Sequence, residues 1–270
     1  MTEFSPASRI QRADERFVTA VEGITTRHAF SFGQHYDPDN VGFGTLLAHN
    51  EESLLSGRGF DDHPHRDTEI VTWVLSGSLL HEDSTGESGI VYPGLVQRLS
   101  AGSGVVHAER NDAYRLQPAS PRVPVRFVQS WVRPDASGVV PSYAQREIEP
   151  AALAADWVPV ASGSDREAGV SIGASTSTLW ITRLSTGTVR LLPEAAYVHL
   201  FVATGEIEVE TVGVLGEGDT LRVAESAALR VTGRRPSELL AWAMGAADRG
   251  RDLVRGRTRS FPESDRGELP

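Results

Sequence analysis

Two short pairs of metal-binding residue types stand out in this chain. His63 and His65 are two positions apart, and so are His107 and Glu109. In a β-strand, side chains alternate between the two faces, so residues i and i+2 point the same way. If the two pairs lie on neighbouring strands, three imidazoles and one carboxylate can converge on one point. That donor set suits a borderline transition-metal ion.

The sequence around these pairs favours short β-strands separated by glycine and proline turns. Runs rich in β-branched and aromatic residues, with alternating polar positions, are typical of strands. We predict strands at residues 69–75, 79–81, 105–109, 126–132, 179–184, 197–203, 206–212, 228–231 and 238–243. Many short strands with frequent turns indicate an all-β sandwich or barrel.

The strand pattern divides into two similar halves. A Pro- and Gly-containing linker at 133–138 separates them, so we expect one barrel in residues 1–135 and another in 136–246. The second half contains only His199 and no His-x-His pair, so a metal site is expected in the first barrel only. Residues 247–270 are rich in Arg, Gly, Asp and Pro and are expected to be poorly ordered.

Composition excludes several classes of function. The chain has no cysteine, which excludes disulfides, thiolate metal ligands and thiol nucleophiles. Acidic residues outnumber basic ones, 36 to 26, and the formal charge of −10 argues against direct binding of nucleic acid. No apolar run is long enough for a transmembrane helix, and the first residues lack the apolar core of a secretory signal. We therefore expect a cytoplasmic protein that does not bind membranes.

The two residue pairs also carry a family resemblance. The first block reads Gly-x5-His-x-His-x3-Glu from Gly57 to Glu69, and the second reads Gly-x2-His-x3-Asn from Gly104 to Asn111. Both blocks resemble the two motifs of the cupin superfamily. The residues that surround the histidines, at 62–66 and 100–109, resemble the pirin family more specifically.

Further segments resemble the bacterial, quercetin 2,3-dioxygenase-like branch of the pirins. They lie at 30–32, 36–38, 42–44 and 81–84, and the whole resemblance covers roughly residues 25–132. It implies a bicupin with two jelly-roll-like barrels, of which the first is the metal-binding domain and the second is degenerate. The monomer is the expected oligomeric state.

The resemblance also implies a ligand set. It assigns one divalent transition-metal ion to His63, His65, His107 and Glu109. Iron is the expected ion, and the same ligands also suit Mn, Co, Ni, Cu and Zn. Glu69, the carboxylate of the general cupin motif, is then not a ligand. Its position agrees, because four residues of extended strand place it about 13 Å from His65.

The activity that the resemblance implies is a metal-dependent dioxygenase of the quercetinase type. It would open a flavonol ring with O2, so a small aromatic substrate and O2 are the expected partners. A metal ion would lower the pKa of the flavonol 3-hydroxyl group, and Glu109 could take its proton as general base. The alternative is a non-enzymatic, iron-binding, redox-sensing co-regulator that acts through protein partners. Fold alone does not choose between them.

Three polar residues are candidates to support the metal ligands. Asp62, Asn111 and Gln129 could hydrogen-bond to the ligand side chains and orient them, although local turn or strand bonds are an equally good interpretation. His81 with Asp83 could line the pocket mouth, but a solvated hairpin is the favoured interpretation.

The remaining aromatic and histidine residues have less specific interpretations. Phe43, Trp73 and Trp131 could form walls around an aromatic substrate, and ordinary barrel core is the expected role of each. Four histidines fit no pattern and are expected on the surface or in a satisfied core: His28, His35, His49 and His199.

Overall fold

The computed structural model describes residues 8–119, 121–225 and 229–245, so the predicted poorly ordered tail at 247–270 lies outside it. Within these ranges the chain is built from β-strands, with one short helix, α1 (Pro150–Ala155), and 3-10 turns at Ala13–Glu15 and Ala113–Arg115. In the described ranges, no helix has the length and apolar character needed to cross a membrane. The all-β expectation is confirmed.

The first half forms a large sheet that faces a small one. The large sheet has seven strands in the order β12 (Ser142–Glu147), β9 (Leu95–Ser100), β6 (Glu69–Ser76), β11 (Val125–Val132), β4 (Leu46–Leu54), β3 (Ile24–His28) and β2 (Phe17–Val21). The small sheet has four strands in the order β5 (Gly59–His65), β10 (Val105–Arg110), β7 (Leu79–Asp83) and β8 (Ser88–Val91). The strands predicted at 69–75, 105–109 and 126–132 correspond to β6, β10 and β11.

The second half repeats this arrangement. Its large sheet has the order β1 (Ser8–Gln11), β20 (Thr220–Ala224), β17 (Tyr197–Thr204), β22 (Ser237–Met244), β15 (Ser177–Leu184), β13 (Val158–Ser162) and β14 (Val170–Ser171). Its small sheet has the order β16 (Val189–Leu191), β21 (Arg230–Gly233), β18 (Glu206–Val209) and β19 (Gly213–Gly216). The strand predicted at 206–212 ends at Val209, and residues 210–212 form the turn into β19, in which Thr211 has a positive φ of 64°.

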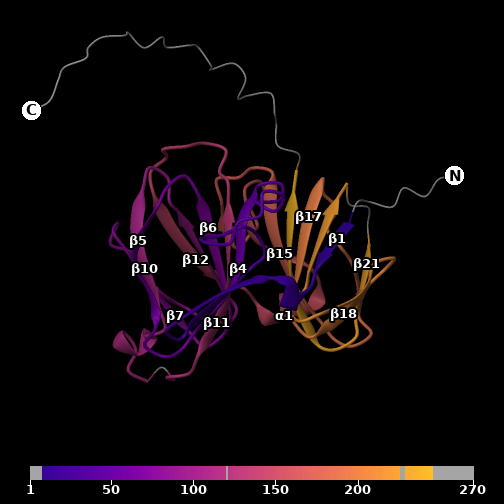
Figure 1. Ribbon diagram of the computed structural model, residues 1–270, viewed down its shortest axis with the longest axis horizontal. Helices are drawn as coiled ribbons and strands as arrows, with labels where there is room; N and C mark the ends of the chain where they lie inside the picture. Colours follow the sequence, from indigo (N-terminus) through magenta and orange to yellow (C-terminus); the bar gives the residue numbers. More distant parts are fainter. Residues whose placement is uncertain (1–7, 120, 226–228, 246–270) are drawn as a thin grey trace, which may run out of the picture.

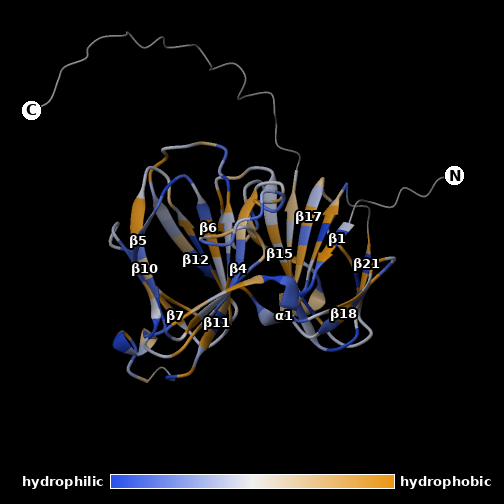
Figure 2. Ribbon diagram, in the orientation of Figure 1, coloured by the Kyte–Doolittle hydropathy of each residue, from blue (hydrophilic) through white to orange (hydrophobic). Residues whose placement is uncertain are grey.

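The two large sheets lie against each other in the middle of the molecule, and the small sheets lie outside them (Figure 1). Each half has its own apolar core between its two sheets. A third core joins the large sheets and includes Trp73, Val128, Phe201 and Trp242. Both faces of the central strands are thus buried, as in β6, whose first six residues are buried. Hydrophobic residues, in orange, occur along strands of both halves (Figure 2).

Strand pairing crosses the predicted boundary at residue 135 in both directions. The N-terminal strand β1 pairs with β20 of the second half, with Ser8 opposite Val223. Strand β12, which follows the linker, pairs with β9 of the first half, with Ser142 opposite Ser100. Each half therefore supplies an edge strand to the other, and the backbone groups of β20 and β9 are covered. The linker separates the two halves along the chain, but each half contributes one edge strand to the large sheet of the other.

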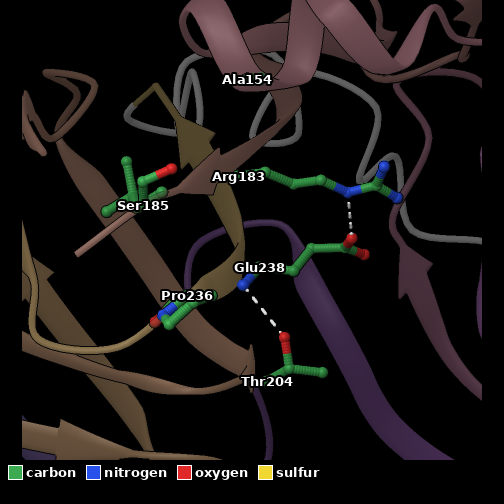
Figure 3. A pocket seen from close by; sticks show the side chains of 8 residues that line it. Ala154, Arg183, Ser185, Thr204, Pro236 and Glu238 are labelled. Atoms are coloured by element: carbon green, nitrogen blue, oxygen red, sulfur yellow. Dashed lines mark hydrogen bonds and ion pairs between the residues drawn. The ribbon is translucent and has the colours of Figure 1, made fainter.

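One polar contact between the halves centres on Glu238 (Figure 3). Its carboxylate pairs with Nε of Arg183 at 2.5 Å, as Figure 3 shows. The indole N–H of Trp73, which Figure 3 does not draw, donates to the same carboxylate at 2.7 Å. A shallow pocket of about 330 Å3 opens beside this pair, and the residues that line it belong to the second half. Trp73 is fully buried in the central core, so its expected role as core residue is confirmed.

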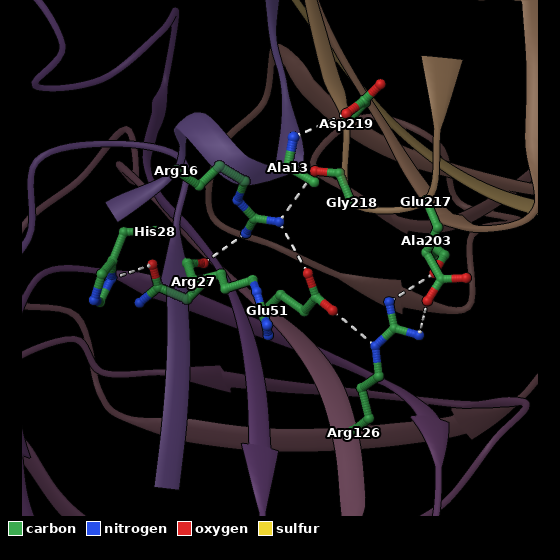
Figure 4. Close-up of polar contacts among 11 residues, drawn as sticks. Ala13, Arg16, Arg27, His28, Glu51, Arg126, Ala203, Glu217, Gly218 and Asp219 are labelled. Atoms are coloured by element: carbon green, nitrogen blue, oxygen red, sulfur yellow. Dashed lines mark hydrogen bonds and ion pairs between the residues drawn. The ribbon is translucent and has the colours of Figure 1, made fainter. Parts of the chain in front are cut away.

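A larger ionic network also joins the halves (Figure 4). Glu51 pairs with Arg16 at 2.9 Å and with Arg126 at 2.7 Å. Arg126 also pairs with Glu217 at 2.7 Å and donates to the carbonyl of Ala203 at 2.9 Å. Glu51 and Arg16 are buried, whereas the side chain of Glu217 is 51% exposed, so the network runs from buried groups of the first half to the surface of the second.

Candidate metal centre

The predicted convergence of three histidines is present. β5 and β10 are antiparallel neighbours, with His63 directly opposite His107 and His65 opposite Val105. The ring centroid of His107 lies 4.4 Å from that of His63 and 4.9 Å from that of His65, and the centroids of His63 and His65 are 4.9 Å apart. One nitrogen from each ring lies within 4.8 Å of the other two. The site lies between the two sheets of the first half.

A β-bulge shapes the wall of this site. The register of β5 against β10 shifts so that His107 faces His63 while Glu109 faces Phe60. One extra residue in β5 reverses the alternation, which brings Phe60 to the same side as His63 with ring centroids 6.2 Å apart. The guanidinium of Arg110 pairs with the carboxylate of Asp61 and holds the bulge in place.

The fourth predicted residue, Glu109, occupies a neighbouring position. It is 1% exposed, and the amide of Gln129 donates to both of its carboxylate oxygens, at 3.0 and 2.7 Å. In the described part of the chain, its ligand atoms group with those of His81 and His107, all within 4.8 Å of one another. His107 is therefore the residue that the two groups share, and Glu109 lies deeper than the cluster of three histidines.

The free nitrogens of the histidines fit a metal ion. Nε2 of His65 and Nε2 of His107 are buried, and no hydrogen-bond partner for either is present among the described residues. Buried polar atoms almost always have a partner, and two such atoms aimed at one point suit a bound cation. Nδ1 of His63 is 2.7 Å from the carbonyl of Asp61, which can only accept, so the proton is on Nδ1 and Nε2 is free.

Burial also keeps His65 and His107 in the neutral form that binds metals. Desolvation, followed by the neighbouring imidazoles, lowers the pKa of His65 to about 4 and that of His107 to about 3. Both rings are thus unprotonated at neutral pH, and a metal ion does not have to displace a proton from them. The donor set of imidazoles without thiolates is typical of open catalytic sites rather than closed structural zinc sites.

His81 is a site residue that sequence analysis assigned to a solvated hairpin, and that interpretation is wrong. It is fully buried on β7, its Nε2 lies 3.1 Å from the Asp83 carboxylate, and Gln97 contacts its Nδ1 at 3.2 Å. The aromatic ring of Tyr143 stacks on it at 4.9 Å. Two leucines precede His81, so the local sequence did not reveal which face of the strand it occupies.

Of the three predicted supporting residues, one contacts a candidate ligand. Gln129 binds Glu109 as described above. Asn111 instead donates to the carbonyls of Leu54 and Val123, at 2.9 and 2.8 Å, and ties loops together. Asp62 is exposed beside Arg110 and Arg115 on the outer surface. The backbone carbonyl of the preceding residue, Asp61, orients the ring of His63 instead.

Of the aromatic candidates, Trp131 lies at the site and Phe43 lies in the core. The ring of Trp131 lies 4.7 Å from that of His65, and its N–H donates to the side-chain oxygen of Gln129 at 3.0 Å. It is therefore part of the wall of the site. Phe43 packs edge-to-face on Tyr197 at the central core, so its expected role as a core residue is confirmed.

Two buried glutamates near the site have different roles. Glu69 accepts a hydrogen bond from Ser100 at 2.6 Å and belongs to neither group of candidate ligands. Glu52, which sequence analysis missed, is hydrogen-bonded to the hydroxyl of Thr26. Burial, with a smaller contribution from Glu109, raises its pKa to about 8. Neighbouring residues in one strand point to opposite faces of the sheet. The adjacent residues Glu51 and Glu52 could therefore have indicated that one acidic side chain lies on each face.

The fold and the site define a class: an all-β protein in which histidines converge between the sheets of its first half. The pirin family model matches residues 10–132, and the chain belongs to the pirin family. A Mycobacterium tuberculosis protein provisionally named quercetin 2,3-dioxygenase is 47% identical over 238 residues, which cover 88% of this chain and 95% of that protein.

Two matches from Escherichia coli complete the comparison. The quercetin 2,3-dioxygenase of strain K12 is 36% identical over 140 residues, which cover 52% of this chain and 58% of that protein. The crystal structure of bacterial pirin YhhW in complex with nickel(II) has a TM-score of 0.79 and 28% identity, and the match covers 89% of this chain and all of that one.

Proposed function

We propose that this chain is a metal-dependent dioxygenase of the quercetinase type, which opens a flavonol ring with O2. The observation that carries the proposal is the cluster of His63, His65 and His107, whose free nitrogens point toward one another beside the buried carboxylate of Glu109. The names of the relatives support the same reaction class. A flavonol and O2 are the substrates in this proposal.

The residues of the site have separate tasks in this reaction. His63, His65 and His107 would hold a divalent transition metal, with Glu109 as the fourth ligand. Iron is the expected ion, and nickel is a further candidate because the E. coli relative was crystallised with it. Bound there, the ion would supply Lewis acidity toward the flavonol 3-oxygen.

Side chains of the protein accept the substrate proton and form the walls of the site. Glu109 is the proposed acceptor of the 3-hydroxyl proton, because it is the carboxylate beside the cluster. The amide of Gln129 keeps that carboxylate in place through two hydrogen bonds. The rings of Trp131 and Phe60 limit the access of water to His65 and His63.

Oxygen consumption tests this proposal directly. Purified protein is analysed for metals, loaded with iron(II) or nickel(II), and assayed with quercetin in an oxygen electrode. We expect O2 uptake in proportion to the loaded metal, and we expect His63→Ala to lose both metal and uptake. Asp62→Ala is the matched control, because this neighbouring side chain is exposed. Fully loaded protein that consumes no O2 with quercetin would rule out the proposed reaction.

The finer architecture is part of the same proposal. We infer that the two halves are two cupin barrels, at 1–135 and 136–246, with edge strands exchanged between them. Each half pairs a seven-stranded sheet with a four-stranded one around its own apolar core. The candidate ligand groups of the described residues all belong to the first half, which supports one metal site per chain.

A further inference from the structure

A second cluster of buried polar side chains lies between the two large sheets, and it contains none of the candidate metal ligands. His199 on β17 is directly opposite Arg222 on β20, and Phe201 is opposite Thr220. Phe201 belongs to the central core. Because strand residues two positions apart share a face, the other three side chains also face the first half. His49 of β4 meets them there, with its ring centroid 4.7 Å from that of His199 and 5.0 Å from that of Phe201.

The polar atoms of this cluster lack partners. Both ring nitrogens of His199, Nε2 of His49, the hydroxyl of Thr220 and Nε of Arg222 are buried, and none has a hydrogen-bond partner among the described residues. The sequence-based expectation of a satisfied core is therefore wrong for His199, which is fully buried. Buried polar atoms almost always have a partner, so five such atoms in one cluster indicate a bound ligand.

Arg222 brings a positive charge into the cluster that no carboxylate balances within the described ranges. Its guanidinium donates to three neutral oxygens: the side chain of Asn40 and the carbonyl of Ala29, each at 2.5 Å, and the side chain of Gln11 at 3.5 Å. Burial lowers the pKa of Arg222 to about 10, so the group still carries its charge at neutral pH. A buried charge without a counter-charge is costly, and an anion would offset that cost.

The unpartnered atoms are mainly hydrogen-bond donors. Nε of Arg222 always carries a hydrogen, and each neutral imidazole carries one. Burial lowers the pKa of both His49 and His199 well below the usual value, so both rings are neutral at pH 7. The hydroxyl of Ser130 accepts from the indole of Trp242 at 3.0 Å and lies 3.1 Å from Nδ1 of His49. Because that nitrogen is the acceptor for the Ser130 hydrogen, the proton of His49 is on Nε2.

We propose that this cluster binds a small monovalent anion of the size of chloride between the two halves of the molecule. An excess of donors beside an unbalanced positive charge favours an anion over water, which brings no charge, and over a metal cation, which Arg222 would repel. Arg16 adds a further buried Nε without a partner among the described residues, and its guanidinium carbon lies 5.3 Å from the centroid of Phe201.

The proposed anion is structural and independent of the dioxygenase reaction. It would contact His49 of the first half and both His199 and Arg222 of the second. It would therefore stabilise the contact between the halves, as the network around Glu51 does on the other side of Arg16.

Thermal unfolding of metal-loaded protein in sodium chloride and in sodium gluconate, at equal ionic strength, tests for the anion. A ligand that binds only the folded state raises the unfolding midpoint as its concentration increases, so we expect a higher midpoint in chloride than in gluconate, a large organic anion. Arg222→Met removes the charge and should lose this difference. Arg98→Met is the matched control and should keep it, because Arg98 is 9% exposed, against 7% for Arg222, but has the carboxylate of Glu69 nearby.

Thr220→Val provides a second variant that does not disturb the contacts of Arg222 with Asn40 and Ala29. It keeps the shape of the side chain and removes only the hydroxyl, so it tests the site even where Arg222→Met fails to fold. Loss of one hydrogen bond to the anion should raise the chloride concentration needed for the same shift of the midpoint by at least about fivefold. An unchanged chloride dependence in Thr220→Val would contradict the proposed site.

Crystals grown in sodium bromide give an independent result. Anomalous scattering should place a bromide ion in contact with His199 and Arg222, and a water molecule at that position instead would overturn the proposal. Equal midpoints of the original chain in chloride and in gluconate would overturn it as well. A chloride effect that persists in Arg222→Met would belong to another site, such as the metal centre, and would also reject the assignment. None of these results depends on whether the protein consumes O2 with quercetin.

Discussion

Nδ1 of His107 lies 3.5 Å from Nδ1 of His81, and this contact favours Nε2 as the nitrogen that His107 offers to a metal ion. The carboxylate of Asp83 only accepts hydrogen bonds, so Nε2 of His81 carries the proton. Nδ1 of His81 is then an acceptor, as its contact with the amide of Gln97 requires. His107 can then donate from its own Nδ1, as the more distant of two donors to that lone pair, which leaves its Nε2 free, in agreement with the lack of a partner for this atom among the described residues.

Removal of this acceptor should weaken metal binding. His81→Phe keeps a ring for Tyr143 to stack on but cannot accept the proton of His107, so His107 is free to adopt the other tautomer. Loss of such an orienting partner typically costs about 10–100-fold in metal affinity, and we expect a loss in this range by calorimetry with nickel(II). His35→Phe changes a histidine that belongs to neither group of candidate ligands and should bind the metal as the original chain does. Unchanged affinity in His81→Phe would refute the tautomer argument.

Gln129 connects the carboxylate of the site to its aromatic wall. Gln129→Leu removes both hydrogen bonds to Glu109 and the acceptor for the indole of Trp131. Buried polar groups left without partners cost about 1–3 kcal/mol each, so urea unfolding should show a loss of stability of at least that size. Gln117→Leu, on an exposed turn, should leave the unfolding midpoint in place. Equal midpoints for the two variants would contradict this role of Gln129.

Glu52 should make the metal-free protein less stable at alkaline pH. Its pKa is raised from 4.5 to about 8, so the folded protein keeps a proton there that the unfolded chain releases. The stabilisation is complete below pH 4.5 and is lost as the pH rises through 8, with a slope of at most about 1.4 kcal/mol per pH unit.

Unfolding of chelator-treated protein between pH 7 and 8.5 isolates this effect, because His65 and His107 are largely neutral in the folded and unfolded states there. We expect Glu52→Gln, which still accepts from Thr26, to flatten the decline in stability. Glu22→Gln should decline like the original chain, since its side chain is 79% exposed. A decline of the same steepness in Glu52→Gln would show that another group is responsible.

Arg126 should stabilise the contact between the two halves. Arg126→Met removes its ion pairs with Glu51 and Glu217 and its hydrogen bond to Ala203. Because Glu51 is buried, we expect the free energy of unfolding to fall by about 1–3 kcal/mol. Arg58→Met breaks an exposed pair with Glu22 of 3.6 Å and should cost at most about 1 kcal/mol. Thermal unfolding that fails to separate the two variants would argue against the network.

The local features of the centre could be predicted from the sequence, because they depend on a period of two residues along a strand. The spacing of His63 and His65, and of His107 and Glu109, places each pair on one face of β5 or β10. Turn residues and β-branched runs likewise located nine of the 22 strands of the described residues. These properties follow from the conformation of one strand and do not depend on its neighbours.

Only the tertiary structure decided how these strands meet. The bulge that brings Phe60 beside His63, and the pairing that brings His81 beside His107, depend on the register between strands far apart in the chain. The exchange of β1 and β12 across the predicted boundary has the same origin. Register is set by hydrogen bonds and packing between strands, and an alternating pattern within one strand fits several registers. The sequence by itself therefore determined which side chains could bind a metal, whereas the sheet pairing determined which of them meet.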